Sequence, residues 1–353
     1  MGTNVKDKRV QYLDIAKGIV MVLVVWQHSK GPFSECITAF HMPFFFLVSG
    51  LLYNGEIPFW KFLGKKFRSL YVPFVFWNIV VYVVAHMNGF RLNSFWKFTK
   101  KVLLTLDKEP DYLGATWFLG ALFAEIILYK LLDSLLKKVK YRRILVTLVF
   151  VLRAAYAFEH TLPHKMSRTL ILGLFFALGV LIKEHKEQLM KYQSRWWLPI
   201  FVLPYLLIAF ETEHGMGDNH YTSAIIFVLG ALMGAYIILE ISKLIEKSNN
   251  KVMDVINRIS CFIGKNSIDI LIWHFVFFRV AIAIQLLLVN KPLNTVFDYD
   301  KRYDTSGAWW LLYLIVGIGC SLIWGRILHL IYQKRIRKII CQVRNDESTQ
   351  REG

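Results

Sequence analysis

The sequence predicts an all-α polytopic membrane protein, and two observations carry that prediction. The chain is 55% hydrophobic with a mean hydropathy of +0.41, and a soluble domain that exposed so much apolar surface would aggregate. Apolar stretches also recur along the 353 residues, many of them near the ~20 residues that cross a bilayer as a helix. Because the bilayer core offers no water to backbone polar groups, such stretches are expected to be helical.

We expect about ten transmembrane helices in one membrane domain over residues 1–340, followed by a polar tail over 341–353. The fifth and sixth stretches are short for a full span. The sequence shows no internal repeat of the kind found in many secondary transporters. The ten stretches cover residues 12–29, 35–54, 69–87, 116–136, 144–159, 169–183, 196–211, 222–242, 267–289 and 308–332.

Lysine and arginine predict the orientation of the chain. When the N-terminus is placed in the cytoplasm, most basic residues fall in the segments on the cytoplasmic side, which is the bias that sets membrane topology. We therefore expect both termini in the cytoplasm. The net charge of +18 is carried mainly by short loops, so it indicates membrane anchoring and predicts no nucleic-acid partner.

Residues 88–113 are the main exception, because they place several basic side chains on the outer side. Two interpretations are open. Residues 94–104 form an amphipathic helix that lies on the outer membrane surface, or this basic segment is part of an acceptor site.

The first stretch carries side chains that a bilayer-crossing helix seldom tolerates. Asp14, Lys17 and His28 lie in it, and a charged group there costs at least about 2.5 kcal/mol. Lys17 and His28 are eleven residues apart, which at ~100° per residue returns to nearly the same helix face, with ~16 Å between them along the axis. Asp14 is one turn from Lys17, close enough to pair with it. The pattern places a cation toward the cytoplasm and an imidazole toward the outside.

Further ionisable side chains lie in other apolar stretches. His41 is near the outer end of the second, Glu125 is in the fourth, Arg153 in the fifth and His274 in the ninth. Such residues normally face the interior of a helix bundle and pair there, and Glu125 with Arg153 is a candidate ion pair. Each residue alone fits a structural polar contact as well as a site. Together they predict a water-accessible cavity inside the bundle.

Lys65, Lys66 and Arg68 form a basic cluster before the third stretch, on the same predicted side as Lys17. Two interpretations are again open. The cluster anchors the chain at the cytoplasmic surface, or it binds phosphate groups, for which arginine offers bidentate contacts and lysine a point charge. The four cysteines are scattered without the spacing of metal ligands, so no metal site is predicted.

Several segments, taken in this order, resemble the integral-membrane acyltransferase 3 family, and within it the fucose 4-O-acetylase-like group of glycan O-acetyltransferases. They are residues 12–28, 41–50, 65–73, 117–119 and 264–274. The resemblance implies transfer of an acyl group, usually acetyl, from cytoplasmic acetyl-CoA. The acceptor that it implies is a hydroxyl of a glycan or lipid-linked sugar at the outer face of a bacterial plasma membrane.

The first-helix motif of the family is a basic residue, ten intervening residues and a histidine considered catalytic. These positions fall on Lys17 and His28. Many members carry arginine at the first position and an arginine-rich motif where this chain has Lys65, Lys66 and Arg68. The resulting hypothesis is that His28 deprotonates the acceptor hydroxyl. Lys17 and the basic cluster then bind the phosphates of acyl-CoA.

His41 or Arg153 is expected to polarise the thioester carbonyl or to orient the base. Direct transfer and a covalent acyl-histidine intermediate are both open. The alternative class is a transporter or flippase, whose intramembrane charges would line a solute path. The identity of the acceptor sugar and the oligomeric state do not follow from the sequence. The residues expected to support the site are Asp14, His41, Glu125, Arg153 and His274.

Overall fold

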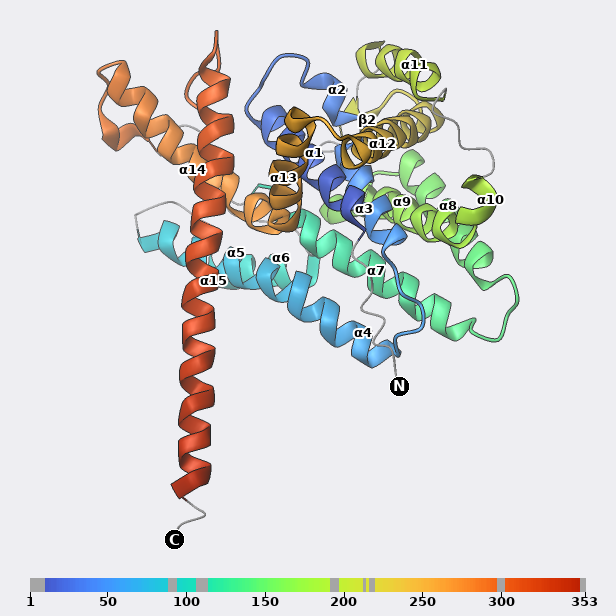
Figure 1. Cartoon of the computed structure of the whole chain (residues 1–353), viewed down its shortest axis with the longest axis horizontal. Coiled ribbons are helices and arrows are strands. Elements are labelled where there is room, and N and C mark those ends of the chain that lie inside the picture. Colours follow the sequence, from blue (N-terminus) through green and yellow to red (C-terminus); the bar gives the residue numbers. More distant parts are fainter. Residues whose placement is uncertain are drawn as a thin grey trace.

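The computed structural model describes residues 10–87, 94–105, 114–190, 197–211, 214–215, 220–296 and 302–349. These residues are helical almost throughout (Figure 1). Two-residue strands form one short antiparallel pair, β1 (His214–Gly215) with β2 (His220–Tyr221). The prediction of an all-α protein is therefore confirmed.

Every predicted apolar stretch falls on a helix. The first half of the chain forms α1 (Gln11–His28), α2 (Glu35–Thr38), α3 (His41–Leu51), α4 (Phe59–Lys66), α5 (Val72–Met87), α6 (Phe95–Thr105), α7 (Trp117–Leu135) and α8 (Arg142–Glu159). The second half forms α9 (Met166–Glu184), α10 (Lys186–Met190), α11 (Trp197–Glu211), α12 (Ala224–Lys247), α13 (Lys251–Lys265), α14 (Ser267–Leu288) and α15 (Trp309–Thr349).

Five helical segments among the described residues are long and apolar enough to cross a membrane by themselves. They indicate a multi-pass membrane protein. The count of ten spans and the cytoplasmic position of both termini stay predictions. The five segments are Phe59–Val84, Pro163–Glu184, Ala224–Lys247, Ser267–Leu288 and Trp309–Gln333.

Two predicted boundaries are wrong. The stretch 35–54 is divided into α2 and α3, because the backbone leaves the helical region at Phe40 (φ −128°, ψ −20°). The third helix does not begin near residue 69, since α4 starts after Pro58 and continues through a π-helical turn, Phe67–Tyr71, into α5. The lysines of α4 lower its hydropathy, so the apolar pattern begins later than the helix does. They are compatible with a helix that enters the membrane, because their long side chains can extend to the membrane surface.

The basic outer segment is partly described. Residues 94–104 were expected to form an amphipathic helix, and α6 confirms the helix. Arg91 and Lys108, which are among its basic residues, lie outside the described residues, and the position of α6 on the outer surface stays a prediction. At the other end of the chain, α15 continues through residue 341 to Thr349, so the predicted polar tail is helical up to that position.

Helix α13 was not predicted, since residues 251–265 lie between the expected stretches 222–242 and 267–289. Asn250 begins the helix, because its side-chain oxygen accepts a hydrogen bond from the Val252 amide at 2.8 Å, as expected of an N-cap. The helix packs closely on α1 at two glycines. A Cβ atom on Gly18 would overlap the Ser260 carbonyl, and one on Gly264 would overlap the Asp14 carbonyl.

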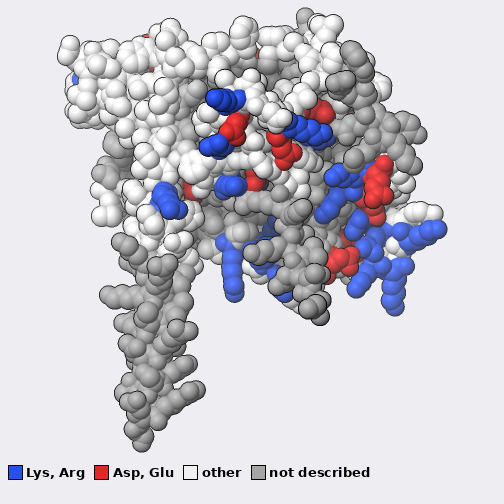
Figure 2. All heavy atoms as spheres, in the orientation of Figure 1, with Lys and Arg blue, Asp and Glu red and all other residues white. Residues whose placement is uncertain are grey.

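The helices form two groups that matter for function. The first-helix group consists of α1, α13 and α14, with α1 also contacting α12, α15 and α3. The ion-pair group consists of α7, α8 and α9, in which α9 contacts both of the others and packs along α3. Figure 1 shows α15 as a long helix that extends well beyond both groups. Figure 2 shows charged side chains gathered near the middle and the lower right of one face, whose upper left is largely uncharged.

Candidate active site

His28 is the last residue of α1, and its imidazole lies beside a second imidazole. The ring centroids of His28 and His274 are 5.3 Å apart, with an interplanar angle of 17°. Phe275 lies against the same His28 ring at 4.7 Å. The pairing was not predicted, because the two histidines are on helices that are far apart in sequence. Tertiary packing thus brings together the predicted base and one of the predicted supporting residues.

The tautomer of His274 follows from its hydrogen bond. Its Nδ1 lies 2.7 Å from the Ile270 carbonyl oxygen, and only a protonated nitrogen can donate to a carbonyl. A neutral His274 ring therefore keeps its lone pair on Nε2. His274 is fully buried, and Nε2 has no hydrogen-bond partner among the described residues. His41 has the same arrangement, with Nδ1 2.8 Å from the Ile37 carbonyl oxygen.

A segment between α14 and α15 lies over the His28 end of α1. The Arg302 guanidinium donates a hydrogen bond to the carbonyl oxygen of His28. The Tyr303 amide donates to the Tyr313 hydroxyl at 2.9 Å. That hydroxyl donates to the Gln285 side-chain oxygen at 2.8 Å, and the Gln285 amide group donates to the Asp304 carbonyl at 3.1 Å. We call residues 302–306 the strap.

Sequence analysis missed the strap, although Gln285 within an apolar stretch was an available signal. The strap ends in a turn in which the Asp304 carboxylate accepts hydrogen bonds from the Ser306 amide at 2.8 Å and its hydroxyl at 2.9 Å. These two bonds hold the pKa of the exposed Asp304 carboxyl below its usual value. At pH values above the ordinary pKa of an aspartate, the ionised Asp304 carboxylate therefore stabilises the turn. This stabilisation is lost as the pH falls through the lowered pKa of Asp304.

The opposite end of α1 carries the predicted pair of Lys17 and Asp14. Their side chains are 2.7 Å apart, and Asp14 is almost completely buried while Lys17 is 20% exposed. The prediction that they pair is confirmed. Asp14 also lies in the first turn of the helix, where the macrodipole favours a negative charge. The central helix therefore has an ion pair at one end and an imidazole pair at the other.

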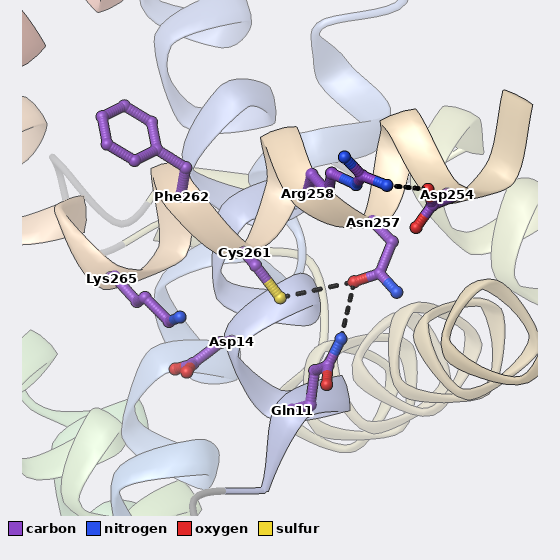
Figure 3. Close-up of a pocket in the computed structure, with 8 residues that line it drawn as sticks. All are labelled: Gln11, Asp14, Asp254, Asn257, Arg258, Cys261, Phe262 and Lys265. Atoms are coloured by element: carbon purple, nitrogen blue, oxygen red, sulfur yellow. Dashed lines mark hydrogen bonds and ion pairs between the residues drawn. The ribbon is translucent and has the colours of Figure 1, made fainter. Parts of the chain in front are cut away.

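A hollow of about 470 Å³ opens between the Asp14 end of α1 and α13. The amide nitrogen of Gln11 donates to the side-chain oxygen of Asn257 at 3.0 Å, and Arg258 pairs with Asp254 at 2.5 Å. Figure 3 shows these groups on the walls of the hollow. Sequence analysis missed it because α13 was not predicted. The lining residues are Gln11, Asp14, Asp254, Asn257, Arg258, Cys261, Phe262 and Lys265.

Glu125 and Arg153 form the predicted ion pair. Two parallel hydrogen bonds of 2.8 and 2.9 Å join the guanidinium to the carboxylate, and the Glu125 side chain is only 3% exposed. Gly173 on α9 leaves room for the carboxylate, because a Cβ atom there would overlap it. The pair lies in the ion-pair group, whereas His28 packs on α14.

The predicted basic cluster lies on a different part of the chain from Lys17. Lys65 and Arg68 are exposed, and the Lys66 ammonium lies 5.7 Å from the centre of the Phe62 ring. Helix α4 and the π-helical turn pack on α7 and lead into α5. Helix α1 has its most extensive contacts with α13 and α12 instead. Phosphate binding by the cluster stays a prediction.

The geometry defines a class: a multi-pass membrane protein whose central helix presents ionisable groups at both ends. Comparison with known families identifies it further. The family model of an acyltransferase domain, Acyl_transf_3, matches residues 10–326, and the chain therefore belongs to this acyltransferase family. The resemblance drawn from the sequence is confirmed. Among the described residues, no group of three histidine, cysteine, aspartate or glutamate side chains is placed to hold a metal ion.

Two relatives share part of the sequence. Nodulation protein NolL of Mesorhizobium japonicum is 26% identical over 241 residues, which cover 62% of this chain and 59% of that protein. Nodulation protein NolL of Sinorhizobium fredii is 30% identical over 134 residues, or 33% of this chain and 35% of that protein. The matched regions thus span less than two thirds of either relative. No solved structure matches the chain.

Proposed function

We propose that the protein is a membrane-embedded O-acyltransferase that moves an acyl group, acetyl in the simplest case, from cytoplasmic acyl-CoA to a glycan hydroxyl. The acceptor is a cell-envelope or exported glycan, or its lipid-linked precursor, in a bacterial plasma membrane. The observation that carries the proposal is the His28–His274 imidazole pair, in a chain that belongs to an acyltransferase family. An imidazole titrates near neutral pH and suits proton transfer from a hydroxyl.

In the proposed reaction, His28 takes the proton of the acceptor hydroxyl as the hydroxyl oxygen attacks the thioester carbonyl. The carbonyl oxygen becomes an oxyanion in a tetrahedral intermediate, and hydrogen-bond donors stabilise its charge. The intermediate then expels the CoA thiolate as the carbon–sulfur bond breaks. The thiolate receives the proton from His28, which returns to its neutral form. Direct transfer of this kind is the simpler form of the reaction, and an acyl-histidine intermediate is the alternative.

His274 is proposed as a positioning residue for His28. The two rings stack, and the Nδ1 bond to Ile270 holds the orientation of His274. Arg302 contributes through its bond to the His28 carbonyl. His41 shares the tautomer of His274 and keeps the supporting role proposed from the sequence.

The donor is proposed to approach from the Lys17 end of α1. Lys17 has its partner Asp14 there, on the side opposite the imidazole pair. Lys65, Lys66 and Arg68 are the phosphate contacts proposed from the sequence, and they are the alternative to the donor site argued in the next subsection. Glu125 and Arg153 neutralise each other's charge in a bidentate pair. We propose that they support the site indirectly, by stabilising the packing of α7 against α8.

The test is release of CoA from acetyl-CoA by the detergent-purified protein, with extracted envelope glycans as acceptor. The wild type is expected to release CoA only when acceptor is present, and His28→Ala is expected to lower kcat by about 10²- to 10⁴-fold, as for loss of a general base. His160→Ala is the matched control, because His160 is an exposed helix-end histidine that also stacks on a ring, that of Tyr156 at 4.1 Å.

Equal release by the wild type and a folded His28→Ala variant would exclude His28 as the base. A wild type that neither binds nor cleaves acetyl-CoA would instead favour the transporter or flippase. Thermal unfolding of each variant in detergent shows whether the comparison is made between folded proteins.

A further inference from the structure

We propose that the hollow between α1 and α13 binds the adenosine-phosphate end of acyl-CoA. This inference rests on the proposed function, since it names where that reaction would hold its donor. The hollow is separate from the Lys65–Arg68 cluster to which the sequence assigned the donor phosphates. Figure 3 shows its walls formed by α13 on one side and the start of α1 on the other.

The position of the hollow relative to the imidazole pair suits a long donor. Helix α1 and the α13–α14 segment contact each other at Gly18 and Gly264 beside the hollow, and again at His28 and His274. The two contacts are ten positions apart in each segment. Along α1 this spacing corresponds to roughly 15 Å of helix. A donor whose nucleotide occupies the hollow therefore needs an extended arm to present its thioester to His28, and the pantetheine part of acyl-CoA is such an arm.

Cations for the phosphates are present in the hollow. Lys265 is exposed and lines the hollow. Arg258 pairs with Asp254, but their side chains are 79% and 50% exposed, and an exposed i,i+4 pair is weak. The guanidinium can therefore turn to a phosphate, which it binds in a bidentate manner. Lys17 lies next to the hollow through its partner Asp14.

The remaining lining groups suit an adenine ring. Gln11 and Asn257 are joined by one hydrogen bond, which leaves further donor and acceptor atoms of both side chains available. Carboxamides pair with adenine through its amino group and a ring nitrogen. Phe262 also lines the hollow and is 56% exposed, but its ring points away from the two carboxamides (Figure 3), so the adenine contacts rest on Gln11 and Asn257. Membrane anchoring alone would explain the cations but neither the carboxamides nor the hollow.

Cys261 provides a direct test, because it lines the hollow and is not in a disulfide. Its thiol is largely buried and donates to the Asn257 side-chain oxygen at 3.5 Å, so alkylation of the unliganded protein is measured first. A full-length variant with Cys36, Cys320 and Cys341 changed to serine retains it as the single thiol. We expect CoA to slow alkylation of Cys261 by iodoacetamide at least tenfold, and 3′-dephospho-CoA or ATP to protect less. A matched variant that retains only Cys36, which follows α1 on the His28 side, is expected to show no protection.

A second measurement uses turnover. Lys265→Ala is expected to raise the KM for acetyl-CoA roughly tenfold or more, as for loss of one charged hydrogen bond, with kcat within about twofold. The same variant should use acetyl-pantetheine as well as the wild type does, because that donor lacks the nucleotide. Lys251→Ala, at the other end of α13 and outside the hollow, is the matched control.

The outcomes separate this inference from the proposed function. If acetyl-CoA is bound and used but CoA does not protect Cys261, the hollow is not the donor site and the acyltransferase proposal stands. If Cys261 does not react even without CoA, the KM of Lys265→Ala decides in its place, and an unchanged KM overturns the inference. The same conclusion follows if Lys65→Ala or Arg68→Ala raises the KM while Lys265→Ala does not. If equilibrium dialysis shows no CoA binding by the wild type, both proposals fail.

Discussion

The first-helix group and the ion-pair group both place ionisable side chains in apolar helices, but they satisfy them differently. Glu125 and Arg153 meet in a bidentate pair inside α7, α8 and α9. In the first-helix group, His274 keeps an unpartnered Nε2 within the described structure, and a hollow opens beside Asp14. We therefore expect an intramembrane ionisable group to belong to the site where some of its bonding capacity remains available.

The ion-pair group should respond to mutation mainly through stability. Arg153→Ala leaves Glu125 as an uncompensated buried charge, which is expected to cost about 3–5 kcal/mol of unfolding free energy. Thermal unfolding in detergent measures the loss, and turnover per folded molecule should change little.

The double variant Glu125→Gln with Arg153→Met is the control, because it removes both charges, and it should recover much of the stability. A stable Arg153→Ala protein that has lost transfer activity would contradict the comparison. It would place the pair in the site itself, as the sequence had suggested.

The contact between α1 and α13 is the next largest expected effect. Gly264→Val directs a side chain against the Asp14 carbonyl, and overpacking of this kind costs about 1–3 kcal/mol. Displacement of α13 should also expose Cys261 to alkylation and raise the KM for acetyl-CoA. Gly319→Ala on α15 is the matched change, since no atom lies near its Cβ position, and it should leave all three readouts close to wild type. Normal unfolding and labelling of Gly264→Val would show that the close contact is not needed.

The strap over the His28 end of α1 allows a finer test near His28. Tyr313→Phe removes the hydroxyl that joins the Tyr303 amide to Gln285, and unsatisfied buried groups cost about 1–3 kcal/mol. Because the strap holds Arg302 against the His28 carbonyl, we expect kcat to fall more than the KM for the donor rises.

Tyr332→Phe is the control on the same helix, since Tyr332 is largely exposed. A rise in KM with unchanged kcat for Tyr313→Phe would mean that the strap acts on substrate binding and not on the base.

The smallest expected change in stability belongs to the exposed pair of Arg258 and Asp254. Arg258→Ala should alter the unfolding free energy by only about 0.3–0.5 kcal/mol, the value of an exposed helical ion pair. The KM for acetyl-CoA should nevertheless rise, because the guanidinium lines the hollow. Steady-state kinetics beside thermal unfolding separates the two effects. A fall in stability without a change in KM would assign Arg258 to the fold alone.

Local patterns predicted most of the helices and one of the polar contacts within a helix. Apolar runs of spanning length placed all ten expected stretches on helices, and the three-residue spacing of Asp14 and Lys17 predicted their pair. The helical start at Phe59 and the break at Phe40 were missed. Both misses have one cause: hydropathy averages over several side chains, whereas a helix begins and ends through backbone geometry at single residues.

The sequence by itself determined that this protein is a helical membrane protein of an acyltransferase family, with a cation and a histidine eleven residues apart on one helix. Helical periodicity and hydropathy are properties of neighbouring residues, so they can be read along the chain. Only the tertiary structure decided that His274 stacks on His28 and that α13 forms a hollow with α1. These contacts join residues more than 200 positions apart, and they depend on helix packing that no local pattern encodes.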